Sequence, residues 1–289
     1  MMKTILNLCF VLLLSFVLIS CTGQNENSTN EEASPLPAIN EETEDSTEPV
    51  YDSLDHGLPS TENQIEPPPA VEDEPDQRFR VDPKTYMIHP VHDTEDAKSS
   101  DKKYVLLTFD DTPTAKATTQ ILDTLDQYQA KALFFVNGHY AEPHLDLLKE
   151  IKARGHLIGN HTWWHIYIRK ESEEKVREEI VGLNDFLEKH LGEKPKYFRP
   201  PFGQNSEVSL RILKEEGMQS MNWSNGSLDW ELKDPKEITK QVLSNIKNGD
   251  NILFHDKQST ADALGNILKA LQEEGYHFVL PTEVVLPEK

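Results

Sequence analysis

The chain has 289 residues and a mass of 33.0 kDa, a length that allows one large domain or two small ones. Its formal net charge of -21 argues against binding to a phosphate backbone, so nucleic-acid binding is not expected as a main activity. The two cysteines, Cys9 and Cys21, both lie near the N-terminus. This placement excludes a disulfide-stapled fold and a cysteine-ligated zinc or iron-sulfur site.

The first twenty residues have the pattern of a secretory signal. Lys3 precedes a nearly continuous apolar run, residues 5–19, that is too short for a comfortable transmembrane helix. The run ends in Leu18-Ile19-Ser20-Cys21, which resembles the lipobox of bacterial lipoproteins, whose cysteine is lipidated and becomes the new N-terminus. We therefore expect a signal peptide over 1–20, a lipid on Cys21 and an extracytoplasmic protein anchored to the cell membrane. The alternative is a plain signal peptide or short anchor with an incidental cysteine.

Residues 21–80 differ in composition from the rest of the chain. They hold sixteen acidic residues against two arginines, Arg78 and Arg80, and eight of the 18 prolines. Such a segment cannot bury enough apolar surface to offset its chain entropy, so we expect a disordered linker. It is interpreted as a tether between membrane and catalytic domain, or as a solvated acidic tail of no selected length. Residues 81–102 follow as a lead-in segment of mixed polarity without a clear period.

From residue 103 to the end, strand-like and helix-like runs alternate. The strand-like runs are Tyr104–Phe109, Ala132–Val136, Leu157–Gly159, Tyr197–Phe198, Gln219–Trp223, Asn251–His255 and Tyr276–Leu280. The helix-like runs are Thr118–Gln129, Leu145–Arg154, Glu173–His190, Ser206–Glu216, Pro235–Lys247 and Thr260–Glu274. This alternation predicts one α/β domain over 103–289 with parallel strands and right-handed crossovers. About seven units favour a barrel over an open sheet, although periodicity does not decide whether the barrel closes.

Ionisable residues follow five of the strand-like runs, at the end where α/β folds gather functional groups. These segments are Asp110-Asp111, Asn160–His165, Arg199–Gly203, Ser227–Trp230 and His255-Asp256. A purely structural protein has no reason for this arrangement.

Two of these segments predict a metal site. His161 and His165 are four residues apart, so on one helical turn both imidazoles would face the same metal ion. In a strand, Asp110 and Asp111 would point to opposite sides, so that one carboxylate could bind the metal and the other accept a proton. A solvated Asp-Asp turn and chance surface histidines are the alternatives. Asp110 is the candidate base, because Thr162 stands where HExxH metalloproteases carry glutamate.

One aspartate and two histidines with open positions are typical of a catalytic zinc site. Zinc lowers the pKa of bound water to roughly 7 and so provides a nucleophile near neutral pH. The ligand types also allow Co²⁺, Ni²⁺ or Mn²⁺.

The five segments, in this order, resemble the motifs of the polysaccharide deacetylases of carbohydrate esterase family 4, the NodB-homology domain. They read TFDD, HTWWH, RPPFG, LDW and LFH over about 103–283. The resemblance implies a distorted (β/α) barrel with fewer than eight regular strands. It also implies that Asp111, His161 and His165 bind the metal and that Asp110 is the general base.

The resemblance assigns roles to the remaining motifs. Arg199 would orient and charge-stabilise Asp110, while His255 would be the general acid, tuned by Asp229. The backbone N–H of Phe202, beside Gly203, would help to hold the oxyanion. In the same way, Trp230 and Leu253 would line the acetyl pocket.

Two positions depart from the family pattern. Thr112 stands where the family often has glycine, so we expect its side chain to narrow the cleft or shift the loop. Gly226 stands where the fourth motif often carries an aspartate. Trp223 is interpreted as a core residue of a strand, and Trp163 and Trp164 as one core and one groove-lining residue.

The sequence thus predicts a membrane-tethered, metal-dependent N-deacetylase of an extracellular glycan. Peptidoglycan is the expected substrate because the tether keeps the domain near the outer face of the membrane, and N-acetylglucosamine is favoured over the bulkier N-acetylmuramic acid. The alternatives are deacetylation of N-acetylmuramic acid or of chitin oligomers, and an inactive carbohydrate-binding lipoprotein. A solute-binding lipoprotein is disfavoured by the five motifs, and no protein partner is evident.

Overall fold

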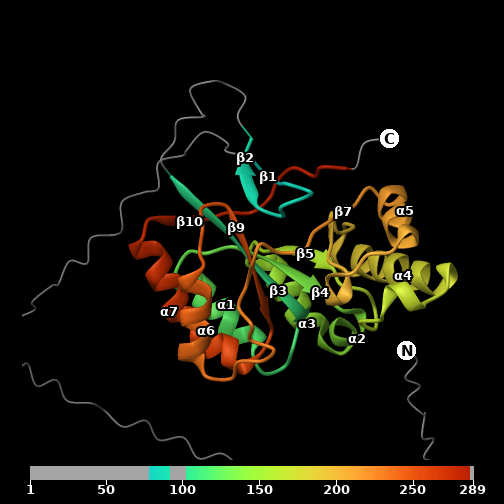
Figure 1. The fold of residues 1–289 in the computed structure, drawn as a ribbon. Coiled ribbons are helices and arrows are strands. Elements are labelled where there is room, and N and C mark those ends of the chain that lie inside the picture. Colours follow the sequence, from blue (N-terminus) through green and yellow to red (C-terminus); the bar gives the residue numbers. More distant parts are fainter. Residues whose placement is uncertain (1–77, 92–101, 287–289) are drawn as a thin grey trace, which may run out of the picture. The chain divides into compact units, whose positions relative to one another are not determined.

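The computed structural model of the chain describes residues 78–91 and 102–286 (Figure 1). Both segments belong to one compact unit. The predicted signal peptide, the lipidation site Cys21 and the predicted linker up to residue 77 lie outside the described residues. Among the described helices, none is long and apolar enough to cross a membrane.

The domain is built on a sheet of parallel strands. The sheet order is β7-β6-β5-β4-β3-β9-β8, and β10 pairs with the first residues of β3. The strands are β3 (Lys103–Thr112), β4 (Ala132–Val136), β5 (Leu157–Asn160), β6 (Tyr197–Phe198), β7 (Gln219–Ser220), β8 (Asn225–Gly226), β9 (Asp250–His255) and β10 (Tyr276–Phe278). The predicted fold, a distorted (β/α) barrel of about seven parallel strands, is confirmed. Within the described residues β7 and β8 do not pair with each other, so the barrel stays open between them.

Helices connect the strands, and most of them follow the predicted runs. They are α1 (Thr118–Gln127), α2 (Gly138–Ala141), α3 (Leu145–Ala153), α4 (Glu173–Leu191), α5 (Glu207–Glu215), α6 (Pro235–Ser244) and α7 (Gln258–Glu273). Side-chain caps set several helix starts. Ser172 accepts a hydrogen bond from the backbone N–H of Lys175 at the start of α4, and Asp234 caps α6 ahead of Pro235.

The main core lies between the sheet and the helices α1, α6 and α7, which gather on one side of it (Figure 1). Phe109 of β3 stacks on Phe134 of β4 at 5.0 Å and on Phe254 of β9 at 5.3 Å between ring centroids. Each of these fully buried rings contributes about 1.5–3 kcal/mol. Tyr104–Phe109 reads as an apolar run interrupted only by Thr108, because β3 is covered on both faces.

A short antiparallel hairpin, β1 (Phe79–Val81) and β2 (Ile88–Pro90), covers the amino ends of the strands. The ring of Phe79 packs on Tyr104 at the start of β3, and the N–H of Ile88 donates to the carbonyl of Gly249 just before β9. The predicted boundary between linker and lead-in, at residues 80 and 81, is wrong because it falls inside β1. Three-residue strands are too short to show a period, and this hairpin is held by tertiary contacts.

Candidate active site

The carboxyl ends of the strands bring the five predicted segments together around one cavity of about 360 Å³. The cavity is lined by Asp110, Asp111, His161, His165, Pro200, Phe202, Gly203, Trp223, Trp230, Leu253, His255 and Lys257. Arg199 and Asp229, both buried, contact lining residues from behind. The structure therefore brings together all the residues that the sequence predicted for the site.

Asp110 and Asp111 lie near the carboxyl end of β3, in a backbone conformation that the sequence did not predict. Asp110 is paired with His255 of β9, but the register against β4 shifts between Phe109 and Thr112. Within this irregularity Asp111 adopts a left-handed backbone conformation with φ of 58°. The expected strand alternation is thus broken, and both carboxylates line the same cavity.

His161 and His165 lie on an irregular loop after β5, so the predicted helical turn is wrong. Thr162 and His165 both have positive φ, 67° and 53°. Side chains hold this loop: Asn160 accepts from the N–H of Thr162 at 2.8 Å, and the buried Glu179 of α4 accepts from the N–H of Trp164 at 2.7 Å. These contacts replace the intrahelical bonds that the spacing alone suggested.

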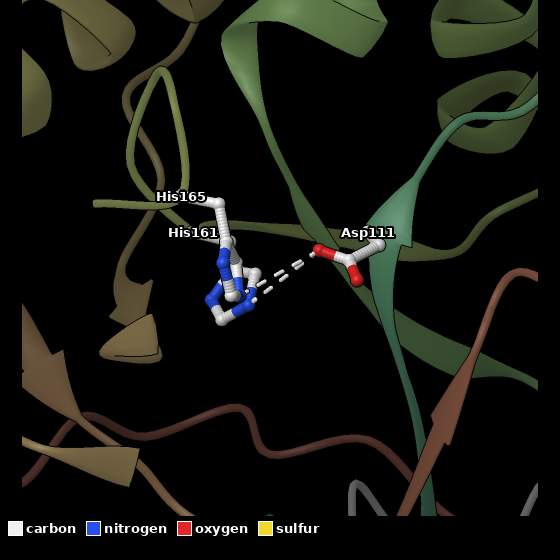
Figure 2. A group of neighbouring side chains, drawn as sticks. All are labelled: Asp111, His161 and His165. Atoms are coloured by element: carbon white, nitrogen blue, oxygen red, sulfur yellow. Dashed lines mark ion pairs between the residues drawn. The ribbon is translucent and has the colours of Figure 1, made fainter. Parts of the chain in front are cut away.

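The loop points both imidazoles at Asp111 (Figure 2). The Nε2 atoms of His161 and His165 each lie 3.9 Å from Oδ1 of Asp111. One potential ligand atom from each residue falls within 4.8 Å of the other two, a spacing that one metal ion can bridge. The structure thus provides a three-residue candidate site of the Asp-His-His type.

The state of His161 fits a metal ligand. Its Nδ1–H donates to the carbonyl oxygen of Arg199 at 2.7 Å, which leaves the lone pair of Nε2 directed at the site. Burial lowers the pKa of His161 to about 3, so the ring is neutral at physiological pH. A neutral imidazole fixed by a backbone carbonyl is the usual form of a zinc-binding histidine.

Arg199 and Asp110 form a buried ion pair beside this site. Nη1 of Arg199 donates to Oδ1 of Asp110 at 2.7 Å and also lies 2.8 Å from Oγ1 of Thr108. The guanidinium also donates to backbone carbonyls and lies 4.2 Å from the ring centroid of Phe135. Burial raises the pKa of Asp110, although the charge of Arg199 opposes this shift. The other oxygen of Asp110 lies 3.7 Å from Nε2 of His161.

His255 and Asp229 form a second ionisable pair at the cavity. Nδ1 of His255 and Oδ1 of Asp229 are 2.7 Å apart, and Oδ2 of Asp229 accepts from the N–H of His255 and from Thr260. Burial disfavours a charged imidazole, but the hydrogen bond and charge of Asp229 outweigh it and raise the pKa of His255. The arrangement holds a protonatable imidazole in the cavity that Asp111 also lines.

Phe202 lies in the 3-10 turn η4 (Pro201–Gly203) with φ of 58° and ψ of 17°. Among the described residues, its backbone N–H donates to no other group, whereas the neighbouring N–H groups of Gly203 and Gln204 are both used. Since Phe202 lines the cavity, this N–H is available to an oxygen atom bound there.

Three lining residues were not predicted, and one expected effect is absent. Trp223 was interpreted as strand core, but β7 ends at Ser220 and the indole lines the cavity. Pro200 and Lys257 also line it, next to motif residues.

Thr112 does not line the cavity. Its side chain is fully buried, with the hydroxyl 3.5 Å from the carbonyl of Phe135 on β4. The expectation that Thr112 narrows the cleft is therefore wrong.

Comparisons with known proteins agree with this geometry. Residues 97–221 match the family model described as polysaccharide deacetylase. The chain is 36% identical over 214 residues to a peptidoglycan-N-acetylglucosamine deacetylase of Bacillus cereus, covering 72% of this chain and 97% of that protein. It is 33% identical over 192 residues to a peptidoglycan-N-acetylmuramic acid deacetylase of Bacillus subtilis, covering 66% of this chain and 40% of that protein.

A solved structure is also similar. The crystal structure of a peptidoglycan N-acetylglucosamine deacetylase superposes with a TM-score of 0.60 at 37% sequence identity. The match covers 62% of this chain and 86% of that one.

Proposed function

Because the chain belongs to the polysaccharide deacetylase family, we propose that it is a metal-dependent N-deacetylase of peptidoglycan, with N-acetylglucosamine as the preferred sugar. The observation that carries this proposal is the convergence, in one cavity, of the Asp111-His161-His165 cluster with the Asp110–Arg199 and His255–Asp229 pairs. Binding of a glycan without chemistry needs none of these ionisable pairs.

Asp111, His161 and His165 would hold the metal, with Zn²⁺ as the first candidate. A divalent ion there supplies Lewis-acid polarisation of the acetamide carbonyl. The adjacent Asp110 is the base that takes the proton from the attacking water, and Arg199 keeps its carboxylate oriented. The ligand types also admit Co²⁺, Ni²⁺ or Mn²⁺.

Other residues that line the cavity would complete the reaction. The free N–H of Phe202 donates to the oxygen that becomes negatively charged on attack. His255, kept protonated by Asp229, gives a proton to the departing amine. Trp230, Leu253 and Gly203, which line the cavity, would enclose the acetyl group.

The substrate assignment rests on similarity and on the shape of the cavity. The relative that the chain covers almost completely is named for N-acetylglucosamine. Trp223 and Trp230 both line the cavity, and bulky rings leave less room for the lactyl ether of a muramic residue. Activity on N-acetylmuramic acid is the second candidate, because another relative is named for that sugar.

The location of the protein is part of the proposal. Lipidation of Cys21 would anchor it outside the cytoplasm, on the cell membrane, where peptidoglycan is the neighbouring polymer. We expect no nucleic-acid partner, because the net charge is strongly negative.

The test is to treat purified peptidoglycan with the full-length protein in detergent and to analyse the resulting muropeptides. We expect acetate release, new free amines on glucosamine, loss of both with a chelator, and recovery with Zn²⁺. Free amines on muramic acid alone would transfer the activity to that sugar. No acetate from peptidoglycan or from N-acetylglucosamine oligomers would leave the inactive carbohydrate-binding protein as the better explanation.

A further inference from the structure

Asp256 follows the candidate acid His255 in the sequence, but it does not line the catalytic cavity. Its side chain is buried, at 4% exposure, and accepts hydrogen bonds from two threonines that follow β3. The N–H and the hydroxyl of Thr114 each donate at 3.0 Å, to different oxygens of the carboxylate, and the hydroxyl of Thr118 donates to Oδ2. A buried carboxylate needs such donors, so these contacts bind the segment 113–118 firmly to Asp256.

The backbone of Asp256 binds the same part of the chain. Its N–H donates to the carbonyl of Asp110 at 3.0 Å, directly beyond the last pair of the β3–β9 ladder, Asp110 with His255. One residue thus holds the chain both before and after Asp111, through Asp110 on one side and Thr114 on the other. The position of the Asp111 carboxylate therefore depends on Asp256.

Asp111 needs such support because regular strand pairing does not fix its backbone. The register between β3 and β4 shifts between Phe109 and Thr112, and Asp111 lies within this irregularity with φ of 58°. A residue other than glycine keeps a left-handed conformation only where the surrounding structure imposes it. The hydrogen bonds to Asp256 on both sides of Asp111 supply that constraint.

We propose that Asp256 is a positioning residue: by binding the segment 113–118, it keeps the carboxylate of Asp111 directed at the metal site. This inference rests on the proposed function, because it takes Asp111 as a metal ligand. Oδ1 of Asp111 lies 3.9 Å from Nε2 of both His161 and His165, so a shift of the loop changes the spacing of all three ligand atoms. Residues that orient a ligand without touching the metal typically contribute roughly 10–100-fold to metal affinity.

The test measures Zn²⁺ affinity by chelator competition on the full-length protein in detergent, with the fold of each variant checked by circular dichroism. Asp256→Ala removes all three acceptor contacts and should weaken Zn²⁺ binding by roughly tenfold or more. Asp256→Asn keeps the shape and one acceptor oxygen, and should recover part of that loss. The visible absorption spectrum of bound Co²⁺, which reports ligand geometry, should also change in Asp256→Ala.

Thr118 allows a second pair of variants on the other side of the contact. Its side chain is fully buried, and its hydroxyl also accepts from the N–H of Thr114 at 2.7 Å. Thr118→Val removes the hydroxyl at nearly constant volume and should weaken Zn²⁺ binding. Thr118→Ser keeps the hydroxyl and should bind Zn²⁺ like the wild type. This pair tests the proposal even if Asp256→Ala does not fold.

Asp250 is the matched control, because it lies at the opposite end of β9. It is as buried as Asp256, at 2% exposure, and its carboxylate also accepts three hydrogen bonds. The donors are the hydroxyl of Ser224, the amide of Asn225 and the N–H of Lys247. Asp250→Ala should therefore lose stability but keep wild-type affinity for Zn²⁺.

Two results would overturn the positioning role. One is wild-type Zn²⁺ affinity in both Asp256→Ala and Thr118→Val, which would leave Asp256 as an anchor for the start of α1 alone. The other is an equal loss of affinity in Asp250→Ala, which would assign the effect to general destabilisation. The proposed function fails by a different measurement, since a wild type that releases no acetate from peptidoglycan would reject the deacetylase whatever the Zn²⁺ affinities are.

Discussion

The buried guanidinium of Arg199 and the buried carboxylate of Asp110 meet at 2.7 Å, and the carbonyl oxygen of the same arginine accepts a hydrogen bond from the ring of His161. One residue thus positions both a candidate base and a candidate metal ligand. The side chain of Arg199 contacts Asp110 and its backbone contacts His161. Substitutions at Asp110 and at His161 can therefore test the effect of each contact on turnover and on metal content separately.

Asp110→Asn should retain the metal and lose most of the turnover. The amide keeps the shape of the side chain but cannot accept a proton from water, and removal of a general base usually costs ~10²–10⁴-fold. Turnover and bound metal are measured on the same preparation. Asp146→Asn, an exposed carboxylate on α3, is the matched control. Near-normal turnover in the Asp110 variant would assign the base to another group.

His161→Ala should cut the metal content sharply and abolish deacetylation. The ring supplies one of three ligand atoms, and no other described histidine lies near enough to Asp111 to replace it. Metal is measured by elemental analysis after dialysis. His277→Ala, an exposed histidine on β10, should keep its metal. Full occupancy in the His161 variant would contradict the ligand assignment.

The pH profile should follow the His255–Asp229 pair. Asp229 raises the pKa of His255 above 6.5, so the protonated acid is present below that raised value and is lost as pH rises through it. Asp229→Asn removes the opposing charge, and burial then lowers the pKa of His255. The alkaline limb of kcat against pH should move to lower pH in the variant. An unchanged limb would show that another group sets it.

Asp256 should make folding stability depend on pH. Its carboxylate accepts from Thr114 and Thr118, and burial raises its pKa from 3.8 to about 6. The folded state therefore binds a proton that the unfolded state releases, so this group's contribution to stability falls as pH rises from about 4 to about 6.

The amide side chain in the Asp256→Asn variant does not titrate in this pH range. The free energy of unfolding of the variant, relative to the wild type, should therefore increase by up to about 3 kcal/mol between pH 4 and pH 7. Urea unfolding of the variant and the wild type at both pH values measures this difference in the free energy of unfolding. The contributions of all other titrating groups cancel, because both proteins contain them. A difference independent of pH would show that Asp256 titrates normally.

Cys21→Ser should yield a protein without lipid, either unprocessed or released from the membrane. Mass spectrometry of the N-terminal peptide from the membrane fraction checks this. Cys9→Ser is the matched control, since Cys9 would be removed with the signal and its variant should keep the lipid. A mature N-terminus downstream of residue 21 would indicate an ordinary signal peptidase.

The long elements of the fold could be predicted from sequence, and the shortest ones could not. The run Ala132–Val136 coincides with β4, and Pro235 after Asp234 marks the start of α6. Two-residue β8 and four-residue α2 span only about one period of a strand or helix pattern, which is too short for a repeat to show. Such elements depend on contacts from distant parts of the chain, as when Gln219 donates to the carbonyl of Val81 in β1.

The composition of the site could be predicted, because parallel strands bring their carboxyl ends to one edge. The backbone that aims each side chain could not. Asp111 and His165 adopt left-handed backbone conformations, which residues other than glycine rarely do. The loop before His165 is held by a hydrogen bond to Glu179 of α4, a distant residue that the local sequence pattern does not indicate. Trp223 was missed for a similar reason, because the strand expected there ends three residues earlier.

The placement of the β1–β2 hairpin has a mechanical consequence. Residue 78, where the described chain begins, lies at the amino ends of the strands, whereas the cavity lies at their carboxyl ends. A force applied to the chain at residue 78 would be resisted by the ion pair between Arg78 and Glu283 and by the hydrogen bonds between Phe79 and Thr282. The catalytic loops bear none of that load directly. If Cys21 anchors the chain as proposed, the domain is held from the side opposite its cavity.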